Sequence, residues 1–158
     1  MKRNKRNFLP LLILMLIVGI LWFYWGHSFP LEKALPEEKW VRMQMWVRDD
    51  TTDEWIWEIE PPALESVLVA IENTTVDRND KDKNLGYTGF EVLLYPESGD
   101  YPTLIYVNDY GKIAVAVAYD LDNYQYFEHG EELFDALSAL VEGQPKKNAD
   151  QGYLKSRT

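Results

Sequence analysis

The segment from Asp80 to Glu91 holds the strongest candidate for a metal site. Its letters are DKDKNLGYTGFE, which put Asp80, Asp82, Asn84 and Glu91 at the first, third, fifth and last places of a twelve-residue loop. Oxygen ligands at these places are typical of a calcium loop between two helices. Two features disagree: the sixth place, which should be glycine, is Leu85, and the residues after Glu91 predict a strand. A solvated acidic loop is the alternative interpretation.

The second candidate is an aromatic contact surface for a ligand or partner. The tryptophans beyond the hydrophobic N-terminal segment are Trp40, Trp46, Trp55 and Trp57, and all lie on the two predicted strands of one hairpin. A flat indole surface could receive a sugar ring or a peptide, because exposed aromatic patches tend to mark contact sites. The alternative is that the rings pack the sheet or rest near a bilayer interface.

Conventional catalytic arrangements are missing from the sequence. The histidines are His27 and His129, so a Ser-His-Asp triad or a histidine metal cluster within the fold would depend on His129 alone. The motifs GxSxG, GxxxxGK[ST] and HExxH do not occur. Acidic pairs such as Asp49 with Asp53 fall in predicted turns, where acids serve solvation and local hydrogen bonding. Carboxylate catalysis without a recognisable motif stays open as an alternative function.

Charge is distributed very unevenly along the chain. Residues 31–143 carry -17, because the whole chain carries -10 while the first thirty residues contribute +4 and the last fifteen contribute +3. Nucleic acid and anionic lipid head groups bind by exchanging counterions for lysine and arginine, so both are repelled by this region. Cations and basic partners remain possible.

An uncharged hydrophobic stretch over residues 8–25 follows a basic cluster in residues 1–7. As a helix it would extend about 27 Å, close to the hydrocarbon thickness of a bilayer. The pattern predicts a transmembrane signal-anchor with a cytoplasmic basic segment, and a cleaved signal peptide is the alternative. Either way, residues 39–143 are expected to form an extracellular domain. With the anchor retained, residues 26–38 form a juxtamembrane stalk and the chain is a single-pass membrane protein.

Hydrophobic periodicity predicts the elements that would position these residues. Strands are expected over 40–47, 55–60, 90–95, 103–107 and 112–119, and amphipathic helices over 64–71 and 133–141. The expected fold is α+β, an antiparallel sheet of about five strands with both helices on one face, preceded by one N-terminal transmembrane helix. The alanines of 112–119 could let the final helix approach closely. Residues 76–84 predict a charged loop, and residues 144–158 a disordered tail.

Three stretches carry a resemblance: EIEPPALESVLVAIENT, GFEVLLYPESGDYPTLIYVNDYGKIAV and YFEHGEELFDALSALVE. They resemble small membrane-attached or lipoprotein domains of Gram-positive bacteria, extracytoplasmic domains whose function is not established. The resemblance covers most of residues 54–142 and implies no catalytic residue. The chain has no cysteine, so it lacks the lipid-bearing cysteine of the lipoprotein members.

These observations favour a non-enzymatic, membrane-anchored interaction or sensing module whose partner is a protein or an envelope polymer. The motivation is the combination of an anchor, a compact domain and no catalytic constellation. The alternatives are a cell-envelope enzyme that uses carboxylates and a structural domain stabilised by calcium.

Overall fold

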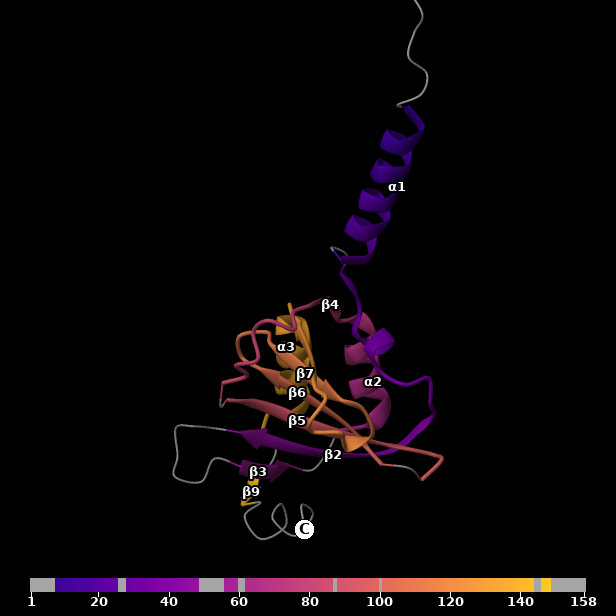
Figure 1. Cartoon of the computed structure of the whole chain (residues 1–158). Helices are drawn as coiled ribbons and strands as arrows, with labels where there is room; N and C mark the ends of the chain where they lie inside the picture. Colours follow the sequence, from indigo (N-terminus) through magenta and orange to yellow (C-terminus); the bar gives the residue numbers. More distant parts are fainter. Residues whose placement is uncertain are drawn as a thin grey trace, which may run out of the picture.

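A computed structural model describes residues 8–25, 28–48, 56–59, 62–86, 88–99, 101–143 and 146–148. Its sheet has the strand order β1-β4-β8-β7-β6-β5-β2-β3-β9, and every neighbouring pair is antiparallel (Figure 1). The strands are β1 (Phe29–Pro30), β2 (Trp40–Arg48), β3 (Ile56–Ile59), β4 (Thr75–Arg78), β5 (Gly89–Pro96), β6 (Thr103–Asn108), β7 (Ile113–Ala116), β8 (Gln125–Glu128) and β9 (Lys146–Asn148). Seven of them have four or more residues, and the two short strands β1 and β9 form the edges.

Two helices, α2 (Leu64–Asn73) and α3 (Glu131–Val141), cover one face of the sheet. Their buried side chains are Val67 and Ile71 of α2 and Leu133 and Leu137 of α3. These four join the inward side chains of the central strands in one apolar cluster, which includes Met45, Val92, Leu94, Ile105, Val115 and Phe127. The predicted α+β class and the placement of both helices on one face are confirmed.

The other face of the sheet is contacted by residues of the segments 79–88 and 117–124, and we call it the loop-covered face. Its apolar cluster contains Trp46, Leu93, Leu104 and Ala116, with half-buried tyrosines packed against it: Tyr95, Tyr119 and Tyr124. The alanines of β7 thus make room for aromatic side chains rather than for a helix, so the prediction that the final helix packs on them is wrong. Helix α3 packs on the larger side chains of the other face, where Ile113 and Val115 are fully buried.

The N-terminal helix α1 (Phe8–Trp25) has the predicted bounds and extends away from the sheet (Figure 1). Its described large apolar side chains are exposed: Leu12, Ile13, Leu14, Met15, Leu16, Ile17, Val18 and Ile20. A membrane-spanning helix requires about 20 predominantly apolar residues. Within the described part of the chain, no helix combines the length and the apolarity needed to cross a membrane. The prediction of an N-terminal transmembrane helix is therefore wrong.

The sheet also differs from the predicted one of about five strands. Strand β4 occupies the start of the predicted loop 76–84, and β8 was not predicted, because four-residue strands rich in polar side chains lack a clear alternation. Strand β1 and the short 3₁₀ helix η2 (Leu31–Ala34) lie in the predicted stalk 26–38, where Leu31 is fully buried and its N–H donates to the Thr74 carbonyl at 2.8 Å. The folded unit therefore begins before residue 39. Strand β9 lies within the predicted disordered tail 144–158 and pairs with β3.

Candidate functional site

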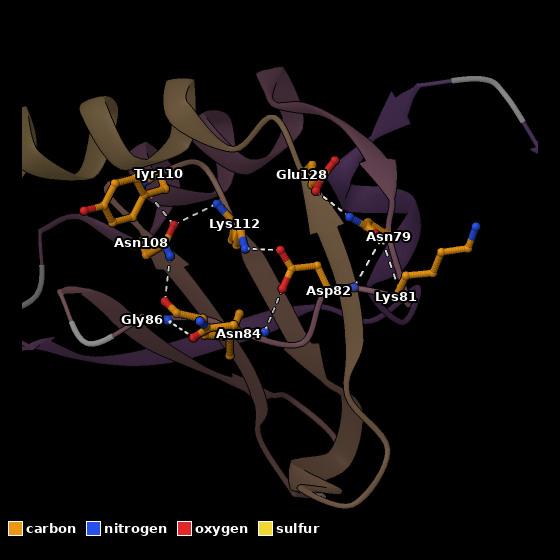
Figure 2. A network of polar contacts seen from close by, with 10 residues as sticks. Asn79, Lys81, Asp82, Asn84, Gly86, Asn108, Tyr110, Lys112 and Glu128 are labelled. Carbon is orange, nitrogen blue, oxygen red and sulfur yellow. Dashed lines mark hydrogen bonds and ion pairs between the residues drawn. The ribbon is translucent and has the colours of Figure 1, made fainter.

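The loop between β4 and β5 contains three of the four residues of the predicted calcium site, Asp80, Asp82 and Asn84, and Figure 2 shows the last two. Lys112 from the β6–β7 turn forms an ion pair with Asp82, whose Oδ1 also accepts the Asn84 N–H at 3.1 Å. The ammonium of Lys112, with help from that N–H, holds the pKa of the Asp82 carboxyl below its usual value. Asp80 pairs instead with Arg78, at 2.7 Å from its Nε.

Asparagines fix the rest of this loop to the sheet (Figure 2). The Asn84 side chain accepts the Gly86 N–H at 3.1 Å, and the Asn108 amide donates to the Leu85 carbonyl at 2.6 Å. The side-chain oxygen Oδ1 of Asn108 in turn accepts the backbone N–H groups of Tyr110 and Lys112. The loop thus closes over one end of the sheet through amide hydrogen bonds and one lysine.

The fourth predicted calcium ligand, Glu91, lies inside the fold. It is 4% exposed and forms an ion pair with Arg48 on the neighbouring strand β2. Tyr106 lies opposite Glu91 on β6, and burial raises the pKa of its hydroxyl to about 12. The structure therefore does not bring Glu91 together with Asp80 and Asp82, whose nearest charged partners are all basic side chains. The calcium site stays a prediction.

The described residues contain no group of three histidine, cysteine, aspartate or glutamate side chains that could hold a metal ion. His129 stands just before helix α3 with a positive φ of 68°, and its Nε2 lies 3.5 Å from a carboxylate oxygen of Asp77 on β4. This pair is exposed and links the residue that follows β8 to β4.

The predicted aromatic surface is divided by the fold. Trp46 is 6% exposed and packs in the loop-covered cluster with Leu93 and Leu104, so its ring is structural. In the β2–β3 hairpin, which is confirmed, Trp57 lies opposite Val47 in the register rather than opposite another tryptophan. Trp55 lies outside the described residues. The side chain of Trp40 lines two hollows of the surface.

A β-bulge at the start of β2 directs Trp40 towards the helix-covered side. Trp40 pairs with Pro96 and Arg42 pairs with Tyr95, so Val41 is an extra residue without a partner in the ladder. An extra residue shifts the alternation of side chains by one place. Trp40 therefore packs against the cluster under the helices, while Val41, which an unbroken alternation would place on the same side as Met43, is 50% exposed.

Trp40 lies between two hollows. The smaller, of about 260 Å³, is lined by the half-buried Trp40 together with Pro36, Glu38, Tyr101, Thr103, Val117 and Ala118. The larger, of about 850 Å³, runs between residues 32–40 and helix α2; its lining side chains include Leu35, Leu68 and Ile71. We call this larger hollow the α2 groove. Its volume falls in the range of about 300–1,000 Å³ that is typical of ligand clefts.

The rim of the α2 groove is acidic. It carries four glutamates, Glu32, Glu37, Glu38 and Glu72, against two lysines, Lys33 and Lys39. Lys39 is already paired with Glu97 at 2.6 Å. Among the described residues, Glu32, Glu37 and Glu72 have no ion-pair partner. A charged partner could therefore bind without first displacing a lysine or arginine from them.

The smaller hollow is bordered by strained backbone. Strand β7 ends at Ala116, and Ala118 and Tyr119 follow with φ of 53° and 56°, a conformation that costs about 1–2 kcal/mol for a residue with a Cβ. The predicted strand 112–119 is therefore too long at its end. Since strained residues often accompany binding sites, the two hollows beside Trp40 are the candidate functional site.

Sequence reasoning found Trp40 but missed its glutamate neighbours. Three of them, Glu32, Glu37 and Glu38, belong to the predicted stalk 26–38. Glu72 belongs to helix α2, for which the sequence predicted only the buried apolar side. One signal was available: the last turn of α2 contains Glu72 and no basic residue, although basic residues are favoured there.

Comparison of the chain with protein-family models, with curated proteins and with solved structures finds no match. The resemblance to membrane-attached or lipoprotein domains of Gram-positive bacteria therefore stays a prediction.

Proposed function

We propose that this domain is a non-enzymatic interaction module that binds a partner protein through the surface around Trp40. The observation that carries the proposal is the β-bulge, which turns one half-buried indole towards the helix side, between two hollows. Bulges recur next to functional sites because they redirect a side chain. A tryptophan in such a position is a typical anchor of a protein interface.

The chemistry of the two hollows supports binding rather than turnover. The larger hollow combines apolar side chains of α2 with a polar rim, which is the usual anatomy of a protein interface. Elsewhere, Arg48 and Lys112 hold the carboxylates of Glu91 and Asp82 in ion pairs. These contacts stabilise strands and loops of the fold. The extracytoplasmic location and the choice between a protein and an envelope polymer as partner stay predictions.

A photo-crosslinking amino acid introduced at three exposed positions of the full chain tests the proposal in intact cells. Glu37 lines the α2 groove and Tyr101 lines the smaller hollow, whereas the 74% exposed Tyr110 lies beyond the opposite end of β6. We expect an adduct of one defined mass at position 37 or 101 and none at position 110. Adducts of equal yield at all three positions, or at none, would overturn the proposal.

A further inference from the structure

We infer that the α2 groove receives a cationic segment of the partner, one in which lysine or arginine side chains flank an apolar residue. This inference rests on the proposed function and adds the chemistry of the partner. Three properties of the groove support it: its unpaired glutamates, the end of helix α2, and the mixed apolar and aromatic lining.

The first property is the charge of the rim. Glu32, Glu37 and Glu72 are rim carboxylates without an ion pair among the described residues, while Lys39 is held by Glu97. The strongly negative charge of residues 31–143 extends this local field. Glutamates outnumber lysines in the groove by four to two, and a cleft in which one sign of charge predominates attracts ligands of the opposite sign.

The second property is the direction of helix α2. Its carboxyl end carries the negative end of the helix dipole, and its last turn contributes Ile71 and Glu72 to the groove without any basic residue. Lysine, arginine or histidine in the last turn of a helix would offset this charge. Here a cation supplied by a partner would take that place.

The third property explains why the partner is a peptide segment rather than a small cation. Leu35, Leu68 and Trp40 line the groove between the glutamates, so an apolar side chain would be buried there. An indole face also attracts an arginine or lysine side chain that lies across it. A segment with both kinds of side chain would pair with the glutamates of the rim and bury its apolar residue against the lining.

The test uses the full chain in an uncharged mild detergent, because α1 exposes apolar side chains on all sides. A labelled peptide that alternates lysine and arginine with leucine is titrated, and its fluorescence anisotropy is compared with that of the same peptide carrying glutamate at the basic positions. We expect the cationic peptide to bind, with an affinity that falls as salt rises, and the acidic peptide not to bind. Spermidine that competes as strongly as the peptide would show that the apolar lining has no part.

The matched variants separate the groove from the general field. Glu37→Gln with Glu72→Gln changes two rim residues, and Glu65→Gln with Glu142→Gln makes the same change in net charge at exposed positions outside the groove. We expect the rim pair to weaken binding roughly three- to tenfold, and the control pair less than twofold. Equal losses for both pairs would overturn the inference. Unchanged thermal melting of both variants shows that folding is intact.

The two proposals fail in different ways. A crosslink at position 37 together with no binding of the cationic peptide would leave the interaction function standing and overturn the cationic partner. Binding of the peptide with no crosslink at position 37 or 101 in cells would overturn the proposed function instead.

Discussion

The two faces of the sheet are held together by different interactions. Under helices α2 and α3 the contacts are almost entirely apolar, and side chains such as Leu94, Ile105 and Leu137 are fully buried. Under the loops, apolar residues share the surface with the Arg48–Glu91 ion pair and the buried Tyr106. The helix-covered face therefore contributes stability through the apolar surface area that it buries. The loop-covered face depends on a few buried polar groups, each of which needs a hydrogen-bond or ion-pair partner.

The largest expected effect lies on the helix-covered face. Leu137→Asp places a carboxylate at a fully buried position, and its desolvation exceeds the marginal stability of a small domain, so we expect loss of folding. The half-buried Leu68→Asp should destabilise less. Thermal melting followed by circular dichroism measures both.

Ala139→Asp is the matched control, because residue 139 is exposed on the same helix. We expect its melting temperature to stay near that of the wild type. A cooperative wild-type transition in Leu137→Asp would contradict the assignment of this face as the core.

The next largest effect is expected on the loop-covered face. Arg48→Met leaves the carboxylate of Glu91 buried without its basic partner, which should lower the free energy of unfolding by about 3 kcal/mol. Adding Glu91→Leu removes the buried charge and should restore most of that loss, because an apolar pair can replace a buried ion pair. Denaturant unfolding of the two single variants and the double variant gives the coupling free energy between Arg48 and Glu91. Purely additive losses would show that the pair does not act as a unit.

The smallest effect is expected at the exposed Asp82–Lys112 pair of the loop. The pKa of Asp82 is lowered in the folded state, so its contribution is present above its ordinary value of 3.8 and is lost as the pH falls through the lowered value. Asp82→Asn should therefore flatten the acid side of the stability profile while changing neutral stability little. Melting temperatures measured from neutral to acidic pH test this, and an unchanged acid limb would contradict it.

The same loop gives the direct test of the calcium hypothesis. Because Asp82 is held by Lys112 and Glu91 by Arg48, we expect the wild-type melting temperature to be equal in chelator and in millimolar calcium. A rise with calcium that Asp82→Asn abolishes would establish the predicted site.

The sequence predicted the elements with strong alternation or helical spacing. Regular apolar positions predicted the β2–β3 hairpin, the central strands β5, β6 and β7, and both amphipathic helices. Each of these patterns places the apolar side chains on one face of the element, and that face must be buried. It failed where the signal is short or polar: β4 and β8 have four residues each, and β1 and β9 fewer. Strand β7 ends before Ala118 and Tyr119, which have left-handed backbone conformations. Glycine is the usual residue in this conformation, and its absence here left the sequence without a signal for the end of the strand.

Taken alone, the sequence determined the α+β class, the acidic charge and the helix-facing core, because these depend on composition and periodicity. The tertiary structure decided which charges meet. Arg48 and Glu91 are distant in the chain and adjacent in the sheet, as are Asp82 and Lys112, so no local spacing could show that the candidate ligands are engaged by basic residues. The bulge at Val41 likewise depends on pairing with β5, and it alone turns Trp40 towards the α2 groove.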